Sequence, residues 1–259
     1  MIHLTINPLL ASGALQFAFD KATVEGKITI SALFVLSLFS WTIIITKARQ
    51  LIIARKAAKR FFAAYAAERD PLEIKRSGAR FFGAPAYALY TRAAEELSYH
   101  LQHNAVAVGG KKRISAASFD AVKVALEETA SAQAMSLEKG MIILSTAVAG
   151  GPFIGLLGTV WGVMETFAGI ARANSASLTA MAPGVAGALI ATVTGLLVAI
   201  PAMFAYNFMV TTIRAITQEL DGFATRYATQ IEHSYVDNRE LEDKIVSALK
   251  RAEKEEELV

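Results

Sequence analysis

The chain has 259 residues, of which 54% are hydrophobic and 19% charged, with a formal net charge of +3 and a mean hydropathy of +0.39. This composition is too apolar for an ordinary soluble domain, yet it retains many charges, so apolar and charged residues must be segregated along the sequence. The sequence has no cysteine, which excludes disulfides, thiol nucleophiles and thiolate metal sites.

Residues 1–27 have their apolar side chains scattered among polar ones. They lack the basic leader and compact apolar run of a cleavable signal. Such a pattern is typical of an amphipathic helix on a membrane surface or of a poorly ordered terminus, and we leave both interpretations open.

Three stretches free of charge are long enough to cross a bilayer. Residues 28–46 would span about 28 Å at roughly 1.5 Å per residue, against a hydrocarbon core of about 30 Å. The second span is predicted at 141–167, around an uncharged run at 141–164, and the third at 183–209, inside a longer uncharged run. The fold class is therefore an all-α membrane protein with three transmembrane helices and long cytoplasmic helical extensions.

Lysine and arginine near the span ends predict the orientation. Six basic residues follow the first span within 47–60, whereas two lysines precede it and are offset by two carboxylates. We therefore expect a periplasmic N-terminal segment at 1–27 and a periplasmic loop at 168–182. The helical domain at 47–140 and the C-terminal helix at 210–259 are then cytoplasmic.

The predicted cytoplasmic segments contain helix breakers at Asp70-Pro71, at 83–85 and at 109–110, and no pattern typical of strands. We interpret Gly109-Gly110-Lys111-Lys112 as a turn between helices, because it lacks the spacing of a phosphate-binding loop. From about residue 114, one helix is expected to continue into the second span, with Gly140 as its sole interruption.

Small and hydroxyl residues recur along the second span at intervals of three and four, which places them on one helix face: Pro152, Gly155, Thr159, Gly162 and Thr166. The spacings Gly151-x-x-x-Gly155 and Gly158-x-x-x-Gly162 favour close helix packing. Threonines in such helices also commonly bond their own i−4 carbonyl. The same face could instead line a polar path through the membrane, and both interpretations stay open.

The third span has a similar small face, formed by Ala188, Thr192, Gly195, Ala199 and Ala202, beside a second one formed by Gly187, Ala191, Thr194 and Val198. Neither span has a charge at its centre. Glu165, near the outer end of the second span, is either an interfacial carboxylate or a proton acceptor at the entry to a path.

These segments resemble the ExbB/TolQ/MotA proton-channel family, most closely ExbB and TolQ. The resemblance is carried by GPFIGLLGTVWGVMETF at 151–167, APGVAGALIATVTGLLVAIP at 182–201 and Tyr206-Asn207, and more loosely by SWTIII at 40–45. It implies a ring of five subunits around two single-span ExbD- or TolR-like partners, each with a membrane aspartate that carries the proton.

The resemblance also implies site residues. The pore threonines of the family fall on Thr159 and Thr192, with Thr166, Thr194 and Glu165 as further members of the ion pathway. Where ExbB and TolQ have a glutamate in the third span, this chain has Gly187, which cannot titrate, and Thr194 on the same face makes sodium coupling an alternative. The helix-packing or pore face comprises Gly155, Gly158, Gly162, Pro183, Gly184, Gly187, Ala188 and Gly195.

Other chemistry has little support in the sequence. His100 and His103 are spaced i, i+3 without a convincing third ligand, and no nucleophile–base arrangement is apparent, so we expect neither a metal site, nor a cofactor, nor an enzyme. The basic run at 47–60 is more simply an orientation signal facing anionic headgroups than a nucleic-acid site. We expect the channel-forming subunit of a motor in the bacterial inner membrane, driven by H⁺ or alternatively Na⁺. A non-conducting membrane scaffold and a gliding or flagellar-type stator subunit are the other candidates.

Overall fold

The computed structural model describes residues 23–108, 111–173 and 178–237. These residues are mostly helical, and the chain forms two compact units. One unit, which we call the membrane unit, comprises Met1–Arg49 and Lys139–Thr211. The other, which we call the polar unit, comprises Gln50–Glu138 and Thr212–Val259. Two helices, α2 (Val24–Ala67) and α7 (Leu178–Tyr235), contribute residues to both units.

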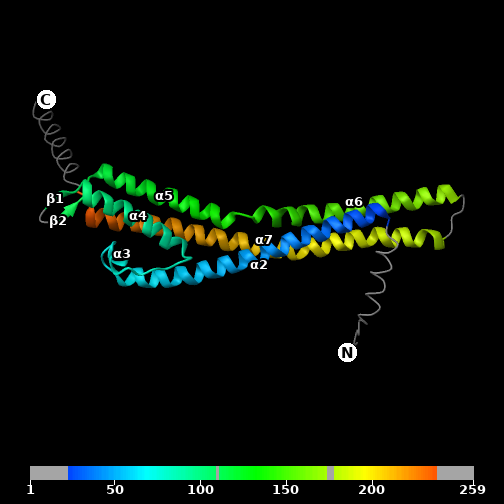
Figure 1. The fold of residues 1–259 in the computed structure, drawn as a ribbon, viewed down its shortest axis with the longest axis horizontal. Coiled ribbons are helices and arrows are strands. Elements are labelled where there is room, and N and C mark those ends of the chain that lie inside the picture. The colour runs from blue at the N-terminus through cyan, green and yellow to red at the C-terminus, as the bar shows by residue number, and fades with distance from the viewer. Residues whose placement is uncertain (1–22, 109–110, 174–177, 238–259) are drawn as a thin grey trace, which may run out of the picture. The chain divides into compact units, whose positions relative to one another are not determined.

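The membrane unit contains segments of three helices long and apolar enough to cross a bilayer: α2, α6 (Met141–Ala173) and α7. They run side by side in Figure 1. Large apolar side chains on their outer surfaces are exposed, including Phe34, Phe153, Leu197 and Phe204. Since such a surface is unfavourable in water, it needs lipid or another protein chain as its surroundings.

The helices are longer than the sequence predicted. The segment 168–182, predicted as a loop, is helical at 168–173 and again at 178–182, because α6 ends at Ala173 and α7 begins at Leu178. The prediction of a loop is therefore wrong for these residues. The first helix begins at Val24, ahead of the predicted boundary at 28, and the remainder of the predicted amphipathic segment lies outside the described residues.

The expected continuous helix into the second span is interrupted. Helix α5 (Ala116–Glu138) ends before α6 begins at Met141, and Gly140 between them has a φ of +88°. A left-handed residue of this kind ends a helix, and glycine adopts it without steric cost. By contrast, α7 continues through Gly222 as far as Tyr235, and the rest of the predicted C-terminal helix lies outside the described residues.

The sequence also predicted that the chain has no strands, and this prediction is wrong. Strands β1 (Val106–Val108) and β2 (Lys111–Arg113) form an antiparallel hairpin in which Val106 pairs with Arg113. A Gly-Gly pair between two short runs is itself a hairpin signal, and the predicted turn at 109–112 separates two strands instead of two helices. Beyond β2, the Ile114 backbone N–H donates to the Tyr235 carbonyl at 2.8 Å, which joins the hairpin to the end of α7.

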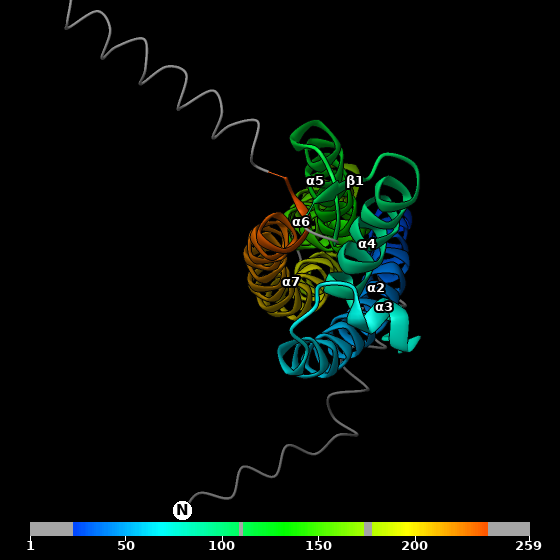
Figure 2. The same ribbon diagram turned by 90° about the vertical axis from the view of Figure 1, so that its left-hand side faces the viewer.

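The core of the polar unit is aromatic. Helices α2, α4 (Pro85–His103), α5 and α7 are seen nearly end-on in Figure 2, with the short α3 (Glu73–Ser77) beside α2. Phe61, Tyr90, Phe223 and Tyr227 are almost fully buried and meet one another in edge-to-face, tilted and stacked pairs. The Tyr227 hydroxyl donates to the Pro71 carbonyl at 3.1 Å, so this core also fixes the loop that follows α2.

Candidate functional site

Glycines bring α6 and α7 together at backbone distance. A methyl group added at Gly155 would lie 2.9 Å from the Ala191 carbonyl oxygen, and one at Gly162 would lie 2.8 Å from the Ala188 Cβ atom. One at Gly195 would lie 2.5 Å from the carbonyl oxygen of Gly151. Ordinary side chains do not fit at such distances. We call this contact between α6 and α7 the glycine seam.

The remaining predicted packing residues also belong to this region. Gly158 faces both Ala191 and Thr29 of α2, at 2.6 and 2.9 Å from an added methyl group. Gly184 lies directly against the Thr166 hydroxyl, and Gly187 is buried. Pro183 lies within α7, and its side chain is outside the described part of the structure.

The two threonines that the family resemblance assigned to the pore lie together on the glycine seam. Thr192 Oγ1 is 3.2 Å from the Gly155 carbonyl oxygen and 3.4 Å from Thr159 Oγ1, in hydrogen-bonding geometry with both. Thr159 Oγ1 in turn donates to the Leu156 carbonyl at 2.6 Å. Both side chains are half-buried, so the pair reaches the surface of the single subunit.

This arrangement determines what the pair can do chemically. Thr159 donates its hydroxyl proton to its own helix, which leaves its oxygen lone pairs as acceptors. A threonine hydroxyl does not titrate near neutral pH, so it can accept a hydrogen bond from water, hydronium or a carboxylic acid but cannot store a proton. The pair is therefore suited to stabilise a polar or protonated group of another molecule.

Thr166 and Thr194 are less distinctive. Thr166 Oγ1 donates to the Gly162 carbonyl and Thr194 Oγ1 to the Ile190 carbonyl, each at 2.8 Å and each four residues back. Such bonds satisfy the hydroxyl within its own helix. Within the described residues, neither threonine is hydrogen-bonded to the Thr159–Thr192 pair.

Glu165 lies apart from the pair. Its side chain is 47% exposed and forms an ion pair with Arg172, which is 70% exposed. Glu165 is six positions beyond Thr159, so the two point to different faces of α6. The sequence analysis missed this ion pair, although the spacing i, i+7 places the two residues on one helix face two turns apart.

Thr29 was also missed by sequence reasoning. It is 7% exposed, and its hydroxyl donates to the Gly26 carbonyl at 2.9 Å. Because it packs against Gly158, it brings the first span close to the glycine seam. The hydroxyl residues of the first span, Thr29, Ser31, Ser37, Ser40, Thr42 and Thr46, follow no helical repeat that could have singled Thr29 out.

The fold and the site define a helical membrane protein whose second and third spans pack through glycine and carry paired hydroxyl groups. The profile of the MotA/TolQ/ExbB proton channel family matches residues 89–222, more than half of the chain, and includes both spans. The chain belongs to this family.

Individual relatives agree with this assignment. The chain is 33% identical over 213 residues to the Tol-Pal system protein TolQ of Haemophilus influenzae, covering 82% of this chain and 90% of the relative. It is 30% identical over 211 residues to the biopolymer transport protein ExbB of Salmonella typhimurium, covering 80% and 82%. It is also 33% identical over 192 residues to ExbB of Pseudomonas putida, covering 73% of this chain and 54% of that protein. The family interpretation made from the sequence is confirmed.

Proposed function

We propose that this chain is the channel-forming subunit of an ion-driven motor in the bacterial inner membrane, and that the Thr159–Thr192 pair lies on its ion pathway. The observation that carries the proposal is the contact of the two hydroxyls across the glycine seam, at 3.4 Å. Two threonines on different helices meet there within the predicted second and third spans, and the pair stays accessible from the subunit surface.

A second chain must supply the titrating group. Within the spans that the structure describes, Glu165 is the one acidic residue beyond the first turn of α2, and it is exposed and paired with Arg172. Gly187 stands where ExbB and TolQ have a glutamate. The proton therefore travels on a membrane carboxylate of a single-span ExbD- or TolR-like partner, which passes the threonine hydroxyls as it moves.

A ring of subunits suits this mechanism. Five copies around two partner helices would present the Thr159–Thr192 pair repeatedly to the partner carboxylate. One elementary charge crossing 100 mV supplies about 2.3 kcal/mol, which is enough to disrupt a few weak hydrogen bonds per step. Equivalent sites in a ring allow such small steps to accumulate into movement of the partner.

In this proposal the N-terminus is periplasmic and the C-terminus cytoplasmic, in accordance with the basic residues at 47–60. The partner then transmits its movement to the periplasm or the outer membrane. The names of the relatives point to biopolymer transport and to the Tol-Pal system, and the partner's periplasmic domain determines which process is energised.

The test compares two double variants of the complete assembly, purified from native membranes with its single-span partner and reconstituted in liposomes. Thr159→Val with Thr192→Val removes the paired hydroxyls. Thr146→Val with Thr211→Val makes the same chemical change at exposed threonines of α6 and α7 that bond their own helices.

Proton uptake driven by an imposed potential is measured with an enclosed pH dye. We expect at least about a tenfold loss for the first variant, since the removal of hydrogen bonds to a charged group costs about 1.5–3 kcal/mol. The control variant should retain its flux. Equal flux in both variants, or an assembly that conducts no ions, would support a scaffold instead.

A further inference from the structure

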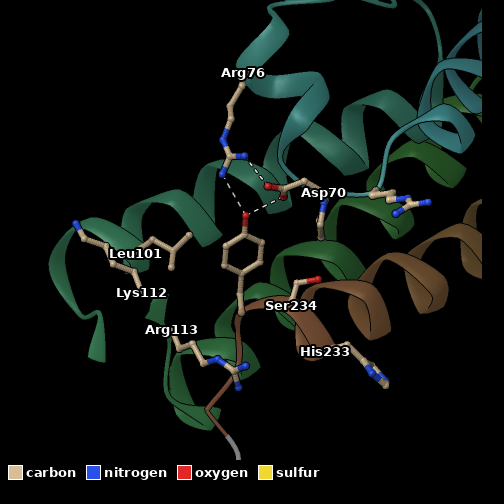
Figure 3. Close-up of a pocket in the computed structure, with 10 residues that line it drawn as sticks. Asp70, Arg76, Leu101, Lys112, Arg113, His233 and Ser234 are labelled. Atoms are coloured by element: carbon tan, nitrogen blue, oxygen red, sulfur yellow. Dashed lines mark hydrogen bonds and ion pairs between the residues drawn. The ribbon is translucent and has the colours of Figure 1, made fainter. Parts of the chain in front are cut away.

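The polar unit contains a cavity of about 630 Å³ that the channel function does not use. Its lining includes Arg69, Asp70, Arg76, Lys112, Arg113 and Tyr235. Figure 3 shows lining side chains from separate parts of the chain: Asp70 from the segment after α2, Arg76 from α3, and Lys112 and Arg113 from strand β2. Tyr235 is the last residue of α7. A volume of this size is typical of sites for small molecules.

Hydrogen bonds hold the walls of the cavity in place. The Tyr235 hydroxyl donates to Asp70 at 2.7 Å, and Arg76 pairs with the other oxygen of the same carboxylate. The Leu72 backbone N–H also donates to Asp70, at 2.9 Å. Although burial alone would raise the pKa of Asp70, the hydrogen bonds from Leu72, Tyr235 and Arg76 hold it below its usual value. Asp70 is thus ionised, and both of its carboxylate oxygens already have hydrogen-bond or ion-pair partners.

The charge that remains is strongly positive. Four arginine or lysine side chains line the cavity against the single carboxylate of Asp70, which is already paired with Arg76. No carboxylate of the described residues lies within ion-pair distance, 4.0 Å, of the side chains of Arg69, Lys112 or Arg113. Within the described residues these three cations therefore have no acidic side chain as an ion-pair partner, and an anion in the cavity would be attracted by all of them.

Arg113 gives a second, independent indication of a missing acceptor. Its Nη1 donates to the Val236 carbonyl at 3.1 Å, whereas its Nε is buried without a hydrogen-bond partner in the described part of the chain. A buried donor left unpaired costs about 1–3 kcal/mol. An anion in the cavity would compete for this guanidinium and offer it oxygen acceptors.

We propose that this cavity binds a small phosphate-bearing anion. Arginine forks match phosphate oxygens in a bidentate manner, and a single phosphate or pyrophosphate group offers enough oxygens to contact several cations at once. The Tyr235 ring and Leu101 provide apolar wall for an organic body attached to the phosphate. The concave shape favours a small ligand over an extended acidic peptide. The phosphate could belong to a soluble metabolite or to a lipid headgroup.

The test uses the full-length protein with its assembly in phosphate-free detergent solution. Arg69→Gln with Lys112→Gln removes two exposed cations of the cavity whose side chains form no described hydrogen bond or ion pair, so folding should be unaffected. Arg55→Gln with Lys56→Gln is the matched control, because both residues are exposed on α2 and do not line the cavity. Binding of inorganic pyrophosphate is measured by calorimetry at fixed ionic strength, and thermal stabilisation by short-chain phosphatidic acid is measured in parallel.

We expect pyrophosphate to bind the native protein and the control equally, and to bind the cavity variant at least about tenfold more weakly. A response to phosphatidic acid alone, lost in the cavity variant and kept in the control, would also support a phosphate site and would assign its source to a lipid. Equal binding by all three proteins, or the binding of neither phosphate probe, would overturn the proposal. So would a clear preference for a synthetic acidic peptide of residues 252–259 over both phosphate probes. Because no ion flux is measured, this result is independent of the channel proposal.

Discussion

The glycine seam predicts a large and specific cost for one added methyl group. In Gly195→Ala, the new Cβ atom would lie 2.5 Å from the Gly151 carbonyl oxygen and 3.2 Å from the Gly155 Cα atom. Ordinary contact begins near 3.4 Å, and both neighbours are backbone atoms that cannot rotate away, so α6 and α7 must separate by about 0.9 Å. A gap of that size forfeits a quarter to a half of each dispersion contact of about 0.1–0.2 kcal/mol.

A seam of about 40 atom pairs, the number of contacts that one buried leucine makes, would lose about 2 kcal/mol of dispersion energy, and the free energy of unfolding should fall by about that amount. The assay is reversible unfolding of the full-length protein in mixed micelles, titrated with a denaturing detergent and followed by helical circular dichroism. Gly150→Ala is the matched control, because a methyl group there meets no atom within 4 Å. We expect its free energy of unfolding to equal the native value or to exceed it by up to about 1 kcal/mol, because alanine is favoured over glycine within a helix. If both substitutions cost the same, the close approach of the two helices is refuted.

Three further predictions concern single residues. Glu165→Gln should leave proton flux within about twofold of the native assembly, because its carboxylate is exposed and held by Arg172; a loss of tenfold or more in the liposome assay would show instead that Glu165 carries the proton. Asp70→Asn should flatten the acid dependence of stability: the depressed pKa of Asp70 means that its contribution is present above about pH 4 and is lost as the pH falls through the folded-state pKa. Because Asp70 is about one-third exposed, that contribution is below about 1 kcal/mol. The free energy of unfolding of both proteins is measured between about pH 2 and 6, and parallel curves of this free energy against pH would show that the network is absent. Gly140→Ala should lower the free energy of unfolding by about 1–2 kcal/mol, because the φ of +88° at this position strains any residue with a Cβ atom. The cost is not a clash, since the nearest side-chain atom, on Ile43, would lie 3.5 Å from the new methyl group. Equal stability of Gly140→Ala and Gly150→Ala would contradict this.

The sequence predicted the three spans and the small faces of the second and third because the physics behind them is local. Charge exclusion over about 20 residues and spacing of three and four are visible in one segment at a time. The spacing of the glycines also predicted a packing face, and Gly155, Gly162 and Gly195 do lie against the facing helix. It did not predict that Gly158 also faces Thr29 of the first span, since that depends on how distant segments meet. The break at Gly140 shows the same limit: Gly222 is also a glycine in a long helix, yet α7 passes through it without interruption.

The polar unit was harder to predict for a related reason. The Gly109-Gly110 hairpin carried a local signal that we interpreted as a turn between helices. The cavity carried none, because Arg69, Lys112 and Tyr235 lie far apart in sequence and converge through the packing of the aromatic core and the bridge from Ile114 to Val236. Convergence of this kind follows from tertiary structure alone.

The sequence left close packing and a polar path as alternatives for the small faces of the two spans, and the structure shows that close packing brings the two hydroxyls together, as the proposed path requires. Thr192 reaches the Gly155 carbonyl at 3.2 Å because no side chain at Gly155 keeps the helices apart. The same approach brings its hydroxyl to Thr159. A seam packed by leucine would hold the helices farther apart and separate the two hydroxyls by more than a hydrogen bond. The glycines therefore position the threonines, and substitutions that widen the seam should lower ion flux even when both threonines remain.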